Sequence, residues 1–322
     1  MKLDSTMKGF GVMYVWSWLS AWNKDFHTGE PRMDSDYHAW VSAPKIKRGV
    51  RDIVADKSRL DTRELLEQCG IRVDEEGFQI MEDPGVRNDF DKTRKLSEEA
   101  SKDFQNSKFR KDYWDNRVYG GMILPEKKSI EGQTEEDENG KKKSKKNVTF
   151  TCRGPLQFAW GRTMDPVELV LEGAQTVTRK CASREDTERG VAQHAVSFIK
   201  CGLFVIPFYY SAVEGKKTGV TDRDLALALR SLPYLGGLKS AANPCTEVVD
   251  CWYFQHKTQK GMTNDSAFIE RMLPVKRNGV KVVSSCDDYV FPTAVPAEIA
   301  PFIDSYENFA IPRLPPPRPV SE

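Results

Sequence analysis

The chain opens on a strand-like segment, Lys8–Trp18 (KGFGVMYVWSW), and the fold can be read outward from it. Its residues are apolar, aromatic and β-branched, a composition that favours a strand buried on at least one face. A polar loop over residues 23–38 follows. Ser42 then precedes Pro44, which is typical of a helix start, and the helix is predicted to run to about Ala55.

The predicted helix has two different sides. One stripe is apolar and is expected to face a core: Ile46, Val50, Ile53 and Val54. The rest of its surface carries cations within two turns: Lys45, Lys47, Arg48 and Arg51. Such a group suits contacts to successive phosphates without base reading, although a merely solvated helix face is the commoner explanation.

Further elements follow in mixed order. Residues 148–158 have strand composition, and residues 195–213 form an apolar strand region that is either bulged or a hairpin at Pro207. Thr221 and Asp224 form a capping box for a helix whose core stripe is Leu225, Leu229 and Leu232. Two more strands are predicted over 245–255 and 281–291. The order favours an α+β fold with a ferredoxin-like (RRM-like) antiparallel sheet and long insertions.

We expect one domain over residues 1–322 with three distinct segments. Residues 60–111 read as a polar helical insertion without a core of its own. Residues 126–146 read as a charged, flexible loop, because a block of acids is followed by a block of lysines. Residues 312–322 form a Pro-rich tail, and LPPPRP (314–319) within it is typical of polyproline helix.

Composition excludes several classes of protein. The 322 residues hold 48 Lys and Arg against 47 Asp and Glu, a formal net charge of +1. No apolar run approaches the roughly 18–20 residues of a membrane span, and the first residues lack a signal-peptide core, so a cytoplasmic protein is expected. Seven scattered cysteines indicate free thiols. Near-neutral charge does not exclude a local basic surface.

No standard catalytic signature is present. The sequence lacks a nucleophile elbow, a zinc-protease helix and a phosphate-binding loop, and the spacing of Cys245, Cys251 and His256 is not that of a zinc site. We expect no metal and no cofactor. One loop could bind a metal or cut RNA by acid–base chemistry, although a turn-rich surface loop is the commoner explanation: Asp25, His27, Glu30, Asp34, Asp36 and His38.

Several strings, in order, resemble the Cas-seven backbone subunits of type I CRISPR surveillance complexes (Cascade), in the Csd/Csh branch of types I-C and I-B. The matching strings are Pro31–Asp34, Ile46–Asp52, Asp115–Gly120, Gly154–Phe158 with Arg162-Thr163 and Pro166-Val167, Val177–Arg179, and Gly236–Asn243. Two departures are that the family's Asn-Gly-Asp-Pro turn is Thr28–Pro31 here, and that its His-Asp-Arg is Gly237–Lys239.

The resemblance implies an RRM-like palm with finger and thumb insertions, for which residues 60–111 and 126–146 are the candidates. It implies copies stacked head-to-tail along a CRISPR RNA, with target DNA recognised by base pairing. Other implied partners are a guide-end-capping subunit and a large subunit. The expected RNA contacts are the four cations of the basic helix, then Arg117, Arg153, Gln157 and Arg179, and then Lys239 and Ser240.

The closest resemblance implies a subunit that is not an enzyme. Two alternatives stay open at this point. A type III-like backbone subunit would cut RNA with an acidic loop residue, for which Asp25, Asp34 or Asp36 could serve. A protein-only structural subunit would explain the neutral charge but leave the basic helix without a role.

Overall fold

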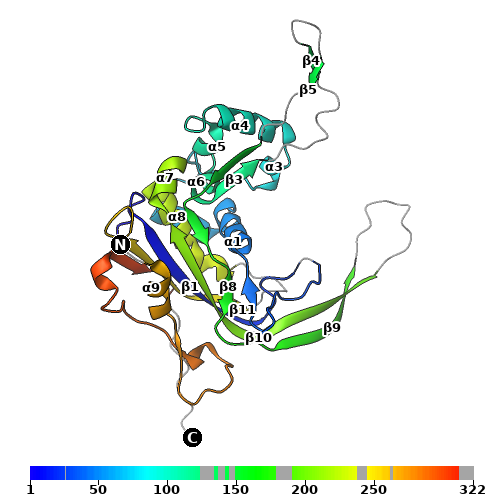
Figure 1. Ribbon diagram of the computed structural model, residues 1–322. Helices are drawn as coiled ribbons and strands as arrows, with labels where there is room; N and C mark the ends of the chain where they lie inside the picture. The colour runs from blue at the N-terminus through cyan, green and yellow to red at the C-terminus, as the bar shows by residue number, and fades with distance from the viewer. Residues whose placement is uncertain are drawn as a thin grey trace.

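The computed structural model describes residues 1–25, 27–123, 134–136, 142–144, 149–178, 191–237, 245–261 and 264–311. Its centre is an antiparallel sheet in the order β14-β11-β1-β10-β8-β2, with β7 and β9 also paired to β10. Helices cover one face of this sheet and the C-terminal part of the chain covers the other (Figure 1). The predicted α+β fold with an antiparallel palm sheet is therefore confirmed.

Strand β1 (Gly9–Ser20) is the centre of the sheet, as its composition predicted. It pairs with β10 (Val191–Tyr210) on one side and with β11 (Cys245–His256) on the other. Phe10, Val12 and Tyr14 point into one hydrophobic cluster, whereas Met13 and Val15 point into the other. Because successive side chains of a strand alternate, a strand that is apolar throughout lies between two cores.

The first face is covered by α1 (Ala43–Ala55), α2 (Leu60–Gln68), α8 (Asp222–Ser231) and η2 (Leu232–Gly237). The predicted stripe of α1 is confirmed, since all four of its apolar residues are at most 1% exposed. The capping box of Thr221 and Asp224 at the start of α8 is confirmed as well. Both helices therefore form where periodicity and capping placed them.

The second face is covered by α9 (Asp265–Arg271), β12 (Val275–Lys276), η3 (Cys286–Asp288), β13 (Tyr289–Val290) and η4 (Ala300–Phe302), before β14 (Ile303–Asn308) joins the sheet edge. The strand predicted over 281–291 is wrong, because only Tyr289 and Val290 are extended in a ladder. Asp288 accepts bonds from the amides of Ser284 and Ser285, and this local turn competes with a strand.

The insertion is helical, as predicted, but has a small core. Besides α2, which packs on the main sheet, residues 60–111 hold α3 (Pro84–Arg87), α4 (Phe90–Lys102) and α5 (Lys108–Lys111). Next in the chain come α6 (Trp114–Tyr119) and the ladder of β3 (Gly120–Ile123) and β6 (Phe150–Arg153), which pack against these helices. Met81, Leu96, Phe109, Tyr113 and Ile123 form its buried cluster. The expectation of no separate core is therefore wrong. Its apolar residues are widely spaced in the sequence and are completed by strands beyond residue 111.

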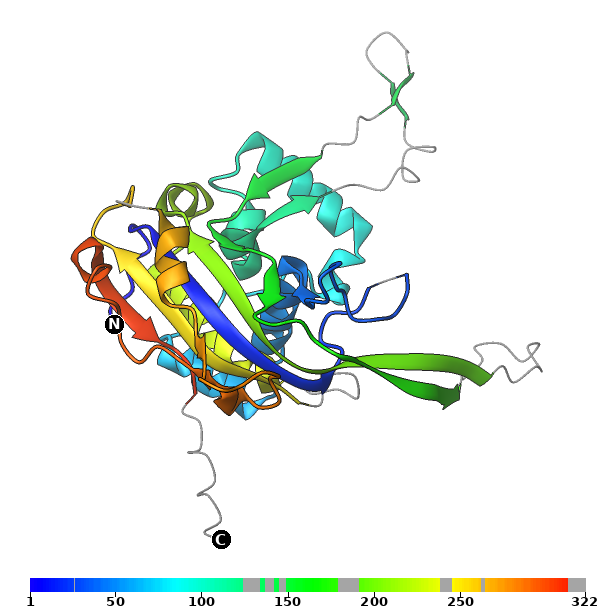
Figure 2. The same cartoon turned by 60° about the horizontal axis from the view of Figure 1, so that its bottom comes forward.

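Strand β10 is one strand of 20 residues and not a hairpin at Pro207. Pro207 lies opposite the break between β7 (Leu156–Phe158) and β8 (Gly161–Thr163), where the ladder is interrupted on that side. The first half of β10 pairs with β9 (Leu169–Thr178), and this two-stranded arm projects far beyond the sheet (Figure 2).

Two predicted segments fall largely outside the described residues. Within 126–146, only β4 (Thr134–Glu136) and β5 (Lys142–Ser144) are described, and they pair antiparallel. The tail 312–322 lies outside, as do Arg179, Lys239 and Ser240. Among the helices of the described ranges, none combines the length and the apolar character needed to cross a membrane.

Candidate nucleic-acid interface

The cations of α1 fall into two pairs with different surroundings. Lys45 and Arg48 are exposed, and Arg48 forms a surface ion pair of 2.8 Å with Asp52. Lys47 and Arg51 are partly buried against the part of the chain that follows the insertion. All four cations therefore lie on α1 as expected, but only Lys45 and Arg48 are exposed to solvent.

Two glycines bring α1 next to distant segments. Gly120 has φ +75°, and a Cβ there would lie 2.3 Å from the backbone nitrogen of Gly154. Only glycine fits at such a crossing, because both the backbone angle and the space exclude a side chain. The crossing joins two of the strings that the sequence singled out, 115–120 and 154–158, and places Tyr119 and Gln157 beside α1.

Lys47 is the link between α1 and this crossing. Its Nζ donates to Oε1 of Gln157 at 3.1 Å, and Gln157 donates from Nε2 to the carbonyl of Gly154 at 2.8 Å. The Lys47 ammonium also lies 5.5 Å from the ring centroid of Tyr119. Two of the predicted RNA contacts, Lys47 and Gln157, are thus brought together.

The pKa of Lys47 is lower than that of an ordinary lysine. Burial lowers the pKa of its ammonium to about 8, and the nearby Arg51 guanidinium acts in the same direction. A lysine with this pKa is largely charged at neutral pH but loses the charge under mildly basic conditions. A bound phosphate would stabilise the ammonium and raise its pKa.

Arg51 serves the fold. Its Nε donates to Oδ2 of Asp115 at 2.9 Å, its side chain is 14% exposed, and its guanidinium lies over the Tyr119 ring. Asp115 is fully buried and also accepts bonds from the amides of Met81 and Glu82. Arg51 thereby joins α1 to the insertion, which the spacing of charges along α1 could not reveal.

Arg117, one of the predicted RNA contacts, is engaged within the protein. The side chain is buried, and its Nε and Nη2 form a bidentate ion pair with Asp224 of α8. Its other N–H groups donate to the carbonyls of Gly77, Arg110 and Lys111. All five guanidinium donors are therefore engaged within the protein.

Arg153 is exposed at the end of β6, immediately before the crossing. It lines a cavity of about 450 Å³ together with Gln157, Lys8 and Lys260. Lys8 also forms an ion pair of 2.6 Å with Asp265. The exposed cations Lys45, Arg48 and Arg153 and the bonded pair Lys47–Gln157 make up what we call the basic surface.

The acidic loop before α1 is held by its own hydrogen bonds. Oδ1 of Asp34 accepts bonds from the amides of Asp36 and His38, and Oδ2 accepts bonds from Nε1 of Trp40 and Nε of Arg162. These donors hold the pKa of Asp34 well below its usual range, although burial opposes them.

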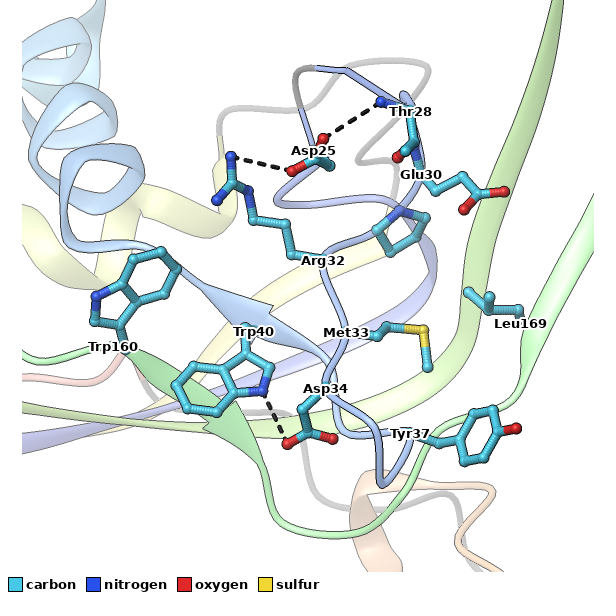
Figure 3. A pocket seen from close by; sticks show the side chains of 11 residues that line it. Asp25, Thr28, Glu30, Arg32, Met33, Asp34, Tyr37, Trp40, Trp160 and Leu169 are labelled. Carbon is cyan, nitrogen blue, oxygen red and sulfur yellow. Dashed lines mark hydrogen bonds and ion pairs between the residues drawn. The ribbon is translucent and has the colours of Figure 1, made fainter.

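Asp25 is engaged in a similar way. It accepts bonds from two amides of its own turn and forms an ion pair with Arg32 at 3.4 Å (Figure 3). The two turn amides hold its pKa low. Within the described residues, no group of three His, Cys, Asp or Glu side chains is arranged to hold a metal ion. These observations favour the turn-rich surface loop.

Comparison with known proteins agrees with the family resemblance of the sequence. A family model described as CRISPR-associated protein Cas7 matches residues 8–294. The chain belongs to the Cas7 family. No curated protein matches it.

Solved structures give distant likenesses to this Cas7 chain. A chain described as "CRISPR RNA-guided surveillance complex, pre-nicking" is 13% identical, with a TM-score of 0.41 over 85% of this chain and 84% of that chain. Another, "CRISPR RNA-guided surveillance complex", gives 13% and 0.39 over 85% and 77%. A third, "Cryo-EM structure of the Type III-B Cmr-beta bound to cognate target RNA", gives 10% and 0.36 over 78% and 62%. At this distance they carry no argument about function.

Some features of this Cas7 protein were not predicted from its sequence. The ion pairs of Asp115 with Arg51 and of Asp224 with Arg117 were not predicted, because the partners are 64 and 107 residues apart in the sequence. The β9 strand of the arm could have been predicted, because its sequence LVLEGAQTVT (169–178) contains several β-branched Val and Thr residues. The predicted strand region 195–213 starts four residues after the observed start of β10 at Val191, so it did not include the whole part of β10 that pairs with β9.

Proposed function

We propose that this Cas7 protein is a guide-RNA-binding backbone subunit of a type I interference complex, in the Csd/Csh branch. Copies of the chain stack head-to-tail along a CRISPR RNA, and the RNA pairs with target DNA. A guide-end-capping subunit and a large subunit complete the complex. The subunit binds RNA through its phosphates, so base edges stay free for pairing.

The basic surface is the observation that carries this proposal. Lys45 and Arg48 on α1 and Arg153 on β6 are exposed, and Lys47 of α1 is bonded to Gln157 of β7. These groups come from segments about 100 residues apart in the sequence, and the Gly120–Gly154 crossing gathers them. A net charge of +1 is compatible with such a clamp, because phosphate contacts need cations only where the RNA runs.

The projecting arm of β9 and β10 supports the same proposal. A subunit that contacts the next copy along an RNA needs an element that reaches beyond its own sheet, and this arm does so (Figure 2). We therefore assign the thumb of the family to the arm, in place of residues 126–146. We assign the finger of the family to the insertion 60–111, the other candidate segment.

We propose further that the subunit cuts no RNA. A catalytic carboxylate must be open to a water, a metal or the substrate. Both oxygens of Asp34 and both of Asp25 accept bonds or an ion pair from the protein, whereas the third candidate, Asp36, is exposed. The engagement of Asp25 and Asp34 favours the type I subunit over a ribonuclease that uses either of them. Cleavage of guide-complementary RNA by the assembled particle, lost in Asp34→Ala, would contradict it.

The test of RNA binding is a double charge reversal, Lys45→Glu with Arg48→Glu. Both side chains are exposed, so the variant should fold, while RNA retention at moderate salt should be lost. The matched control is Arg271→Glu with Lys281→Glu, which makes the same change in net charge on the opposite side of the sheet. Equal RNA retention by the two variants would overturn the assignment of the basic surface.

A further inference from the structure

A groove beside the acidic loop is not used by the proposed RNA contacts. It lies at the edge of the sheet formed by β2 (Trp40–Val41) and β8, and its volume is about 560 Å³. Its apolar walls come from Met33, Tyr37, Trp40, Trp160 and Leu169 (Figure 3).

The aromatic side chains of the groove are unusually available. Trp40 and Trp160 meet edge to face with ring centroids 6.0 Å apart, and Trp160 is 49% exposed. Tyr37 has φ +63°, a conformation that a tyrosine rarely adopts, and its side chain is 67% exposed. Strained and exposed aromatic residues around a groove are typical of a binding surface and not of a core.

The charge of the groove selects its occupant. Asp25, Glu30 and Asp34 line it, against the single lining cation Arg32. Asp25 and Asp34 have arginine partners, whereas the carboxylate of Glu30 has neither a hydrogen-bond nor an ion-pair partner among the described residues. Carboxylates repel an RNA phosphate and attract a cation. An aromatic groove with a free carboxylate therefore fits an apolar segment that carries an arginine or lysine.

The chain itself contains such a segment. LPPPRP (314–319) places Arg318 among four prolines. Proline-rich segments dock as polyproline helices on aromatic-lined grooves, and a basic residue beside the prolines gives the contact its direction through an acidic partner. The groove offers both partners, aromatic walls for the prolines and Glu30 for Arg318.

Geometry indicates a second copy as the donor of this segment. The described chain ends at Ile311, just after the edge strand β14, whereas the groove is at the opposite edge. One row of ladder partners crosses the sheet from β2 to β11: Trp40, Arg162, Val205, Tyr14 and Asp250. At the far edge, Asn308 of β14 is paired with Trp252 of β11 and donates a side-chain hydrogen bond to Asp250.

The reach of the tail favours the groove of another copy over its own. The five strand spacings from β2 to β14 amount to about 24 Å in a straight line. Arg318 follows Ile311 by seven residues, which span about 22 Å as polyproline helix, and the route around the sheet is longer than the straight line. A head-to-tail contact, by contrast, joins two different surfaces of neighbouring copies, as these two edges are.

We propose that the groove of Tyr37, Trp40 and Trp160 binds the Pro-rich tail of the neighbouring copy, with Arg318 paired to Glu30. This inference rests on the proposed function, because the stack along RNA brings the two copies together. The tail would then connect each subunit to the next one in the stack.

The first experiment is photo-crosslinking from position 37. Full-length chains carrying a benzophenone amino acid in place of Tyr37 are mixed with isotope-labelled chains and assembled on a long RNA. The expected product joins position 37 of one copy to residues 312–322 of another. A crosslink to RNA, to the tail of the same copy, or to any other segment would overturn the proposal.

The second experiment uses charge exchange. Glu30→Lys and Arg318→Glu should each weaken assembly on long RNA by about tenfold, the effect of one lost charge-assisted contact, and the double variant should recover it. Binding to an RNA long enough for only one copy should stay unchanged in all three. No recovery in the double variant overturns the tail contact. Failure of wild-type chains to bind even the short RNA would instead contradict the proposed function.

Discussion

Arg48 and Arg51 lie one turn apart on α1 but have different roles. The Arg48 side chain is 47% exposed, and its partner Asp52 is exposed as well. The Arg51 side chain is 14% exposed, and its partner Asp115 is fully buried. Removing a partner from a buried charge is costly, whereas an exposed pair contributes little. A charge reversal at Arg51 would therefore test the fold and not RNA binding.

We predict that Arg51→Ala lowers the free energy of unfolding by about 3–5 kcal/mol, because it leaves the Asp115 carboxylate buried without its cation. Arg48→Ala, the matched control on the same helix, should change it by less than about 1 kcal/mol. Urea unfolding of both variants measures the difference. Equal stabilities would show that Arg51 does not anchor the insertion.

A second prediction concerns the pH dependence of RNA binding through Lys47. Its pKa of about 8 means that the ammonium is present below pH 8 and is lost as pH rises through that value. RNA affinity should fall from pH 7 to pH 9, and the salt dependence should lose about 0.7 in its logarithmic slope, the value of one phosphate contact on a single strand.

Lys47→Arg is the control for this titration. Arginine stays charged over the whole range, so affinity and salt slope should then be constant between pH 7 and pH 9. A fall of equal size in the arginine variant would assign the titration to another group.

At the level of the elements, sequence patterns succeeded where local physics decides. The apolar stripe of α1, the capping box of α8 and the buried β1 are set by neighbours along the chain. Patterns failed where a distant partner decides. The resemblance listed Arg117 among the RNA contacts, and no pattern along the chain showed that Asp224 and three carbonyls bind its guanidinium. The apolar residues of 281–291 resembled a strand, but Asp288 folds them into a turn.

The family resemblance added what patterns could not. The strings 115–120 and 154–158 came from the resemblance, and the structure brings them together at the Gly120–Gly154 crossing. Gln157 was expected among the RNA contacts for the same reason, and it lies against Lys47. The string 115–120 contains Asp115 and the capping box contains Asp224, but neither pattern predicted that these carboxylates pair with Arg51 and Arg117.

A third prediction tests the charged segment between β3 and β6. Deleting residues 128–146 leaves 124–127 and 147–149 to connect Ile123 with Phe150, which are paired in the ladder. A loop of this length closes a hairpin easily, so folding should be preserved. We expect guide affinity to change by no more than about twofold, the scale of an ordinary surface change.

Filter binding and thermal unfolding measure the two effects of this deletion. A matched variant keeps the length and replaces Lys141, Lys142, Lys143, Lys145 and Lys146 by Ser. A large loss of affinity in both variants would show that the lysines hold RNA. A loss in the deletion alone would show that the length of the segment matters.

The basic surface, the acidic groove and the start of the tail lie on different parts of the molecule. The basic surface lies where α1 meets the Gly120–Gly154 crossing, the acidic groove lies beyond β2, and the tail follows the opposite edge strand. The basic surface and the acidic groove carry opposite local charges, and both are compatible with a net charge of +1. Such an arrangement suits an open stack whose length the RNA determines.

The most direct test of this account is the mass of the particles that the chain forms on guide RNAs of increasing length. Mass photometry at moderate salt, with the partner subunits present, counts the copies. We predict that the number of copies rises in proportion to RNA length and that the Lys45→Glu, Arg48→Glu variant forms no such particles. A copy number that stays fixed as the RNA lengthens, or a chain free of RNA throughout, would contradict a guide-RNA backbone.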